Sequence, residues 1–212
     1  MLIEASEEAL SDLGLAALAI RQTQPGQRHT GIVYRVDDSG AVFLLHLAWN
    51  YRLVSEAFSA PYLWVQTSLP IREQRYVAGL CALIADRQPG IPYGLERSGV
   101  SFDVSTGDIL VSEQGKGLTC ASFILAVMQT VGLTLLKEDE WPLDNNDEWQ
   151  RWVIEMLHKT KASQAQIDAV ERDVGSRRFT PEEVVASSTD SPWPIGLDRA
   201  IELSGDLLSQ LH

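Results

Sequence analysis

Three side chains of this 212-residue sequence could together form a nucleophilic site: the thiol of Cys120 and the imidazoles of His29 and His46. A thiol becomes an effective nucleophile when a neighbouring base takes its proton, and that base needs a second polar group to fix its tautomer and orientation. One cysteine and two histidines satisfy these three requirements. Such a site would attack a carbonyl carbon.

Cys120 opens an almost wholly apolar run, which reads GLTCASFILAVMQTVGL. Thr119 is a suitable N-cap, so Cys120 is expected in the first turn of a helix that Gly132 can close. Free N–H groups and the helix dipole favour a thiolate there. Apolar residues lie on all faces of this helix, so we expect it to be packed on every side. A buried structural cysteine fits the same pattern, because free cysteine is often buried.

The two histidines bracket a predicted β-hairpin, formed by the runs HTGIVYRV and AVFLLHLA around the turn DDSG. If Val36 and Ala41 close this turn, Gly31 lies opposite His46, and His29 shares a face with His46 as its diagonal neighbour. A turn one residue longer or shorter would send the histidines to opposite faces. A core histidine can be satisfied by one carbonyl, but two imidazoles on one face favour a site.

Composition and charge exclude several classes of function. The chain has 17 basic and 29 acidic residues, and the resulting formal charge of −12 repels nucleic acid and anionic lipid. We expect no integral membrane segment and a cytoplasmic location, because the amino terminus is acidic and no apolar stretch is long enough to span a bilayer. Cys81 and Cys120 are expected to be free thiols. They and the four histidines show no metal-ligand spacing, so no metal or cofactor is expected.

The remaining pattern predicts an α+β fold. Before residue 136 we expect a helix over residues 7–21, a strand in PYLWVQTSL, a helix in PIREQRYVAGLCALIADRQPG, and short strands in FDVS and DILVS. After Leu136 the sequence predicts three or four helices, one of them capped by Thr180 with Pro181 at its first position. We therefore expect an α+β core over residues 1–136 and a helical extension over 137–212 that packs on it. These C-terminal helices are a candidate surface for a protein partner.

Two segments resemble a known group of proteins. RHTGIVYRVDDSGAVFLLHLA, followed some seventy residues later by TCASF, is similar to the circularly permuted NlpC-type papain-like cysteine hydrolases, which include the lecithin retinol acyltransferase-like proteins and related amidases. The order His, His, Cys is the permuted one. The resemblance covers roughly residues 28–48 and 117–133. It implies a papain-like fold with a central nucleophile helix packed on an antiparallel sheet.

The resemblance also implies roles for individual residues. By position, His29 is the general base, His46 the orienting residue and Cys120 the nucleophile, with the backbone N–H of Cys120 as one oxyanion donor. Thr119 stands where an asparagine commonly precedes the cysteine, which leaves the second oxyanion donor unassigned. Tyr93 is a candidate for that donor or for a hydrogen bond to substrate, and a turn tyrosine packed on the core is the alternative. Tyr93 and Thr119 are the expected substrate-binding residues.

These expectations lead to three hypotheses. In the first, the protein is a cysteine peptidase, amidase or acyl transferase that forms a thioester acyl-enzyme on an amide or ester substrate, preferably a peptide-like amide. In the second, it is a catalytically inactive papain-like protein that binds or regulates a partner. In the third, it is a structural α+β domain. An open cleft beside Cys120 favours the first hypothesis, and a sealed thiol favours the second.

Overall fold

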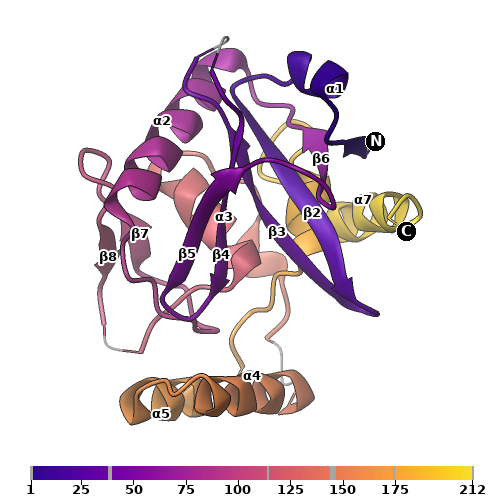
Figure 1. Cartoon of the computed structure of the whole chain (residues 1–212). Coiled ribbons are helices and arrows are strands. Elements are labelled where there is room, and N and C mark those ends of the chain that lie inside the picture. Colours follow the sequence, from indigo (N-terminus) through magenta and orange to yellow (C-terminus); the bar gives the residue numbers. More distant parts are fainter. Residues whose placement is uncertain (1, 38–39, 114, 144–146, 174, 212) are drawn as a thin grey trace.

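The computed structural model describes residues 2–37, 40–113, 115–143, 147–173 and 175–211, and shows an α+β fold (Figure 1). Within these residues, six strands form one antiparallel sheet in the order β1-β6-β2-β3-β4-β5, and two further strands form a hairpin. The sheet strands are β1 (Ile3–Glu4), β2 (Ala16–Gln24), β3 (Gln27–Tyr34), β4 (Phe43–Trp49), β5 (Arg52–Ala57) and β6 (Leu63–Gln66). The separate hairpin consists of β7 (Val100–Phe102) and β8 (Ile109–Val111).

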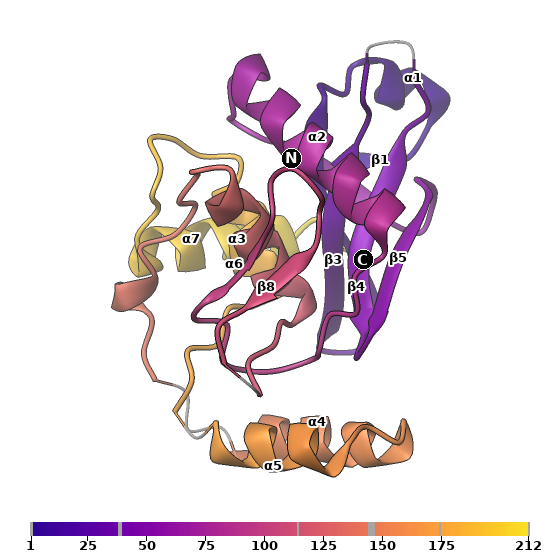
Figure 2. The same ribbon diagram turned by 90° about the vertical axis from the view of Figure 1, so that its left-hand side faces the viewer.

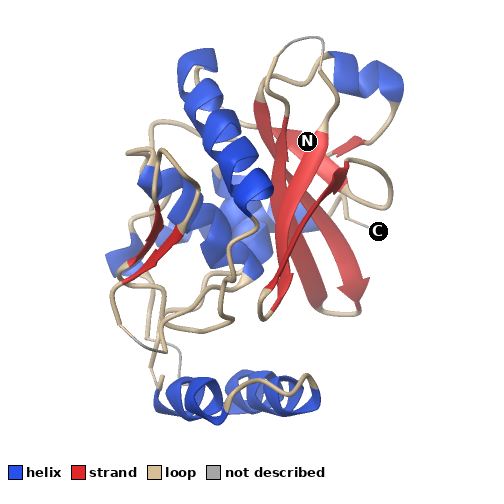
Figure 3. Cartoon of the chain, turned by 60° about the vertical axis from the view of Figure 1, so that its left-hand side comes forward, coloured by secondary structure: helices blue, strands red, loops and turns tan. Residues whose placement is uncertain are grey.

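Most of the helices gather on one face of the sheet (Figures 2 and 3). Their bounds are α1 (Glu7–Ser11), α2 (Ile71–Arg87), α3 (Cys120–Thr130), α4 (Asp147–Lys159), α5 (Gln164–Arg172), α6 (Pro181–Ser187) and α7 (Leu197–Leu208). Helices α2, α3, α6 and α7 share one large apolar core with the sheet. Helix α1 packs on the opposite face, where Ala17, Ala19, Val33 and Leu44 form a smaller core.

The segment 7–21 corrects the sequence-based expectation of a helix. Only α1 is helical, and the alanine-rich part that follows is the central strand β2. Leu18 and Ile20 point into the large core, whereas Ala17 and Ala19 point into the smaller one. This strand is buried on both faces, so packing against both cores overrides the helical propensity of its alanines and leucines.

The register predicted for the histidine hairpin is confirmed. Strands β3 and β4 pair with Val33 opposite Leu44, so Gly31 lies opposite His46 as expected. Of the four turn residues, 38–39 lie outside the described residues. A β-carbon at Gly31 would approach Cβ of His46 to 2.8 Å, and this position therefore requires glycine.

Helix α3 begins at Cys120, as predicted. The side chain of Thr119 accepts a hydrogen bond from the backbone N–H of Ser122, and the hydroxyl of Ser122 accepts one from the backbone N–H of Thr119, which completes a capping box. Residues 121–128 of the helix are all buried. Gly132 follows the helix with a φ of +80°, a conformation that glycine adopts without strain. The predicted helix around Cys81 is α2, and both cysteines are free.

The region after Leu136 is helical, as predicted. Thr180 caps α6, with Pro181 at the first helical position. Helices α6 and α7 contribute Val184, Val185 and Leu207 to the large core, whereas α4 and α5 form a separate hairpin (Figure 1). The domain boundary at residue 136 stays a prediction. None of the helices in the described residues combines the length and apolar character that a membrane span requires.

Candidate functional site

The two histidines meet at the end of the β3–β4 hairpin. Nε2 of His29 lies 2.8 Å from Nδ1 of His46, a hydrogen-bond distance. His46 is buried, and the missing side chain at Gly31 leaves the space that the two rings occupy. Because Nε2 of His29 is engaged, Nδ1 is the nitrogen of this ring that remains for a reaction partner.

A carboxylate extends this pair outward. Oε1 of Glu56, on the neighbouring strand β5, lies 3.4 Å from Nε2 of His46, and 52% of the Glu56 side chain is exposed. This separation is longer than an ordinary hydrogen bond, so Glu56 acts on His46 mainly through its charge. Burial lowers the pKa of His46, and the charge of Glu56 opposes that shift. The carboxylate thus favours a protonated form that burial disfavours.

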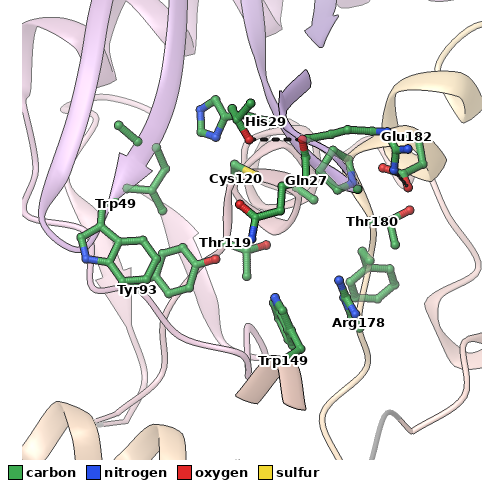
Figure 4. A pocket seen from close by; sticks show the side chains of 18 of the residues that line it. Gln27, His29, Trp49, Tyr93, Thr119, Cys120, Trp149, Arg178, Thr180 and Glu182 are labelled. Carbon is green, nitrogen blue, oxygen red and sulfur yellow. Dashed lines mark hydrogen bonds and ion pairs between the residues drawn. The ribbon is translucent and has the colours of Figure 1, made fainter. Parts of the chain in front are cut away.

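Cys120 reaches the same place from the other side of the sheet. Cys120, which is half-buried, and His29 line one cleft (Figure 4), and within the described residues no hydrogen bond joins the sulfur to either imidazole. The backbone N–H groups of Thr30, Cys120 and Ala121 lie near enough to the sulfur to lower the pKa of the Cys120 thiol. The β3–β4 ladder ends at Ile32, so the N–H of Thr30 is available for this contact.

Burial lowers the pKa of His29 to about 3, and the positive charges of His46 and Arg21 add to this shift. Arg21 faces His29 across the β2–β3 ladder and lies over the ring of Tyr62, 4.6 Å from the ring centre. His29 is therefore neutral near pH 7, and a neutral imidazole is the form that can accept a proton.

The expected thiolate at Cys120 is not the resting form, which corrects the sequence-based expectation. Burial raises the pKa of the thiol to about 11, and the negative charge of Glu182 contributes to the rise. The backbone N–H groups at the helix start lower the pKa, as predicted, but desolvation has the larger effect. Near neutral pH the cleft thus contains a neutral thiol and a neutral imidazole.

The cleft beside Cys120 has a volume of about 280 Å³ and is open to solvent. Its walls come from the β2–β3 hairpin, the end of β4, the loop before α3, helix α4 and the start of α6. Tyr93 and Thr119, the expected substrate-binding residues, both line it. Thr119 uses its hydroxyl as the helix cap, whereas the buried ring of Tyr93 stacks on Trp49 at 4.2 Å between ring centres.

Three residues in or near the site were not predicted from the sequence. Gln27 extends its side-chain amide into the cleft toward Cys120 and Thr119 (Figure 4). Arg178 lines the same cleft, and Glu56 lies behind His46. None of the three belongs to a local motif. Only Glu56 had a sequence signal, and it was weak: Glu56 lies in the strand that follows the histidine hairpin directly in the sequence.

Comparisons with protein-family models, with curated proteins and with solved structures found no match for this chain. In the described part of the chain, no cluster of three or more histidine, cysteine or carboxylate side chains is arranged to hold a metal ion.

Proposed function

We propose that the protein is a cysteine-dependent hydrolase or acyl transferase, with Cys120 as nucleophile, His29 as general base and His46 as the residue that orients the base. The observation that carries this proposal is the hydrogen-bond distance of 2.8 Å between the two imidazoles, because His29, the first of the pair, lines a cleft that Cys120 also lines. We further propose that the α+β fold is papain-like and related to the permuted NlpC-type group, on the basis of the shared His, His, Cys order.

The contacts indicate which nitrogen of each imidazole carries a proton. His29 carries its proton on Nε2 and donates it to Nδ1 of His46, and His46 carries its own proton on Nε2, which faces Glu56. Nδ1 of His29 then has a free lone pair to accept the proton of the Cys120 thiol. The imidazolium formed in this step is stabilised by the lone pair of His46 and by the charge of Glu56.

The reaction proceeds through an acyl-enzyme. As the thiol proton moves to Nδ1 of His29, the sulfur of Cys120 bonds to the substrate carbonyl carbon. The bond from that carbon to the amine or alcohol breaks, and His29 returns the proton to the leaving group. Water or an acceptor alcohol or amine then attacks the thioester, gives a proton to His29, and releases the acyl group. The same proton passes back to the sulfur and restores the thiol.

Two groups are available to stabilise the oxyanion of the tetrahedral intermediate. The backbone N–H of Cys120, at the first position of α3, faces the sulfur and the space beside it. We assign the second donor to the side-chain amide of Gln27, because this exposed side chain projects into the cleft (Figure 4). An amide donor next to a helix start is a common form of oxyanion hole.

The open cleft supports an enzyme over the alternative of an inactive binding protein. An inactive protein would have no need to keep both Cys120 and an oriented His29 in the lining of an open cleft. Buried polar pairs of this kind also cost desolvation energy, which a structural role does not require. The helices after Leu136 remain a candidate surface for a protein partner.

Acylation by 4-nitrophenyl acetate tests the proposed function. We expect a burst of 4-nitrophenolate equal to the protein concentration, with the acetyl group found on Cys120 by peptide mass spectrometry. Cys120→Ser and His29→Asn should abolish the burst. Cys81→Ser is the matched control and should retain it, because Cys81 is fully buried in α2.

Circular dichroism spectra show whether each variant is folded before its burst is compared. A folded His29→Asn variant that acetylates Cys120 at the rate of the unaltered protein would refute the role of His29. Acetylation of Cys120 that is no faster in the folded protein than in urea would refute catalysis altogether.

A further inference from the structure

The walls of the cleft differ sharply in character. On one side Trp49 stacks on Tyr93, and Trp152 packs edge-on against Trp49, 6.0 Å between ring centres. Across the cleft lie Trp149 and Arg178 (Figure 4). An aromatic wall of this kind suits an apolar or aromatic group of a ligand, since ring faces contribute contact area with little loss of side-chain entropy.

Arg178 is positioned as an anion receptor. Its guanidinium carbon lies 4.5 Å above the centre of the Trp149 ring, which holds the group over the ring face. Stacking uses the face of a guanidinium and leaves its N–H donors, which point outward in the plane, available for a bidentate partner. Within the described residues, no carboxylate forms an ion pair with Arg178.

Arg28, the second arginine of the cleft, forms an ion pair. Nη1 of Arg28 lies 2.9 Å from Oε1 of Glu182, and both side chains are largely buried. This pair is internally neutral and has little capacity for another charge. The free positive charge of the cleft therefore lies on Arg178, in a chain whose formal net charge is −12.

Tyr93 connects the arginine with the nucleophile. Burial and the charge of a Cys120 thiolate raise the pKa of the Tyr93 hydroxyl, whereas the charge of Arg178 lowers it. Both groups are thus near enough to act on one hydroxyl. Cys120, Tyr93 and Arg178 all line this cleft, so one ligand can contact the sulfur, the guanidinium and the aromatic wall together.

We infer that the substrate is a peptide-like amide that carries a carboxylate, which Arg178 binds, next to an apolar or aromatic group held against Trp49 and Tyr93. This inference rests on the proposed function of Cys120. A single guanidinium balances the single charge of a carboxylate. A doubly charged phosphate would meet only one free arginine, because Arg28 is already neutralised by Glu182, and a single guanidinium does not balance its charge.

Matched alkylating probes test the inference. We would compare bromoacetyl-phenylalanine and bromoacetyl-alanyl-phenylalanine with their C-terminal carboxamides, and measure the rate at which each labels Cys120. We expect at least one carboxylate to react about tenfold faster than its carboxamide, a ratio typical of one charge-assisted hydrogen bond. The preference should fall to about one in Arg178→Gln and be only partly kept in Arg178→Lys, which retains the charge but not the planar fork.

Arg172→Gln is the matched control, because it removes the same charge from an exposed position on α5 outside the cleft. Its carboxylate preference should equal that of the unaltered protein. Iodoacetamide, which has no carboxylate, measures the reactivity of Cys120 itself in every variant. If 4-nitrophenyl acetate acetylates Cys120 no faster in the folded protein than in urea, the proposed function fails.

If 4-nitrophenyl acetate acetylates Cys120 faster in the folded protein than in urea but no carboxylate probe shows a preference that depends on Arg178, the inference fails while the proposed function stands. A competition experiment separates the two kinds of anion. Acetyl-phenylalanine should protect Cys120 from iodoacetamide better than inorganic phosphate does. Stronger protection by phosphate would overturn the assignment of a carboxylate.

Discussion

The rings of His29 and His46 meet edge to face, inclined by 80°, with Nε2 of the first lying 2.8 Å from Nδ1 of the second. This single contact fixes which nitrogen of His29 is directed away from its partner. The exposed Glu56 lies behind the pair, with its Oε1 3.4 Å from Nε2 of His46. His46 therefore contacts the proposed base directly, and Glu56 acts on the base through His46.

Glu56→Gln should slow the labelling of Cys120 by 4-nitrophenyl acetate. Without its negative charge, residue 56 no longer stabilises the imidazolium that forms on His29. We therefore expect the acetylation rate to fall about tenfold. The free energy of unfolding should change by less than about 1 kcal/mol, because Glu56 is half-exposed. Stopped-flow measurement of the burst and urea unfolding check both expectations.

Glu155→Gln on α4 is the control for this substitution, since it removes a similarly exposed carboxylate far from the histidines. Equal rates for Glu56→Gln and Glu155→Gln would exclude a role of Glu56 in the site.

Gly31→Ala should destabilise the protein by about 1–3 kcal/mol, the usual cost of overpacking a buried position. The added carbon would lie 2.8 Å from Cβ of His46 and 2.9 Å from the backbone oxygen of Leu45, neither of which can rotate away. His46 should be displaced, and the acylation rate should fall with it. Urea unfolding gives the change in stability.

Gly79→Ala is the control for Gly31→Ala and should stabilise the protein. Gly79 lies within α2, and a β-carbon there meets nothing within 4 Å. We expect a gain of about 0.5–1 kcal/mol, because alanine favours the helix. A destabilisation by Gly31→Ala that is no larger than the effect of Gly79→Ala would contradict the close approach at His46.

The rate of Cys120 alkylation by iodoacetamide should rise with pH. The reactive form is the thiolate, and burial raises the pKa of Cys120 to about 11. The rate should therefore increase about tenfold per pH unit between pH 6 and pH 10. A thiolate–imidazolium pair present at rest would give a plateau in this range instead, and that profile would contradict the neutral pair. Mass spectrometry of the labelled peptide follows the reaction.

Acid should destabilise the folded protein through His29. The pKa of His29 is about 3 in the folded protein and 6.5 when the ring is not buried. Between pH 3 and pH 6.5 the unfolded chain therefore binds one proton more than the folded protein. The stability contributed by neutral His29 is fully present above pH 6.5 and decreases as pH falls toward 3, by at most about 1.4 kcal/mol per pH unit. Solvent screening of this half-buried ring reduces the slope.

Urea unfolding of the unaltered protein and of His29→Gln at several pH values between 4 and 8 isolates this effect from other titrations. The stability difference between the two should be constant above pH 7 and should shift against the unaltered protein below pH 6. A difference that is independent of pH would show that His29 titrates normally in the folded state.

Local chemistry determined two parts of the site before any fold was known. The register of the β3–β4 hairpin follows from the alternation of its residues and the length of one turn, and it placed Gly31 opposite His46. The start of α3 follows from Thr119, whose hydroxyl caps a free backbone N–H. Both features depend on neighbours in the sequence, which is why a pattern could predict them.

The tertiary structure alone decided the rest. Strand β2 forms where a helix was expected, because two separate cores bury its two faces. The sulfur of Cys120 meets Thr30, and Arg178 reaches the same cleft from a distant part of the chain. The pKa of Cys120 depends on how far water is excluded from the thiol, and that exclusion comes from every element packed around it. Sequence patterns encode such contacts only through the complete fold.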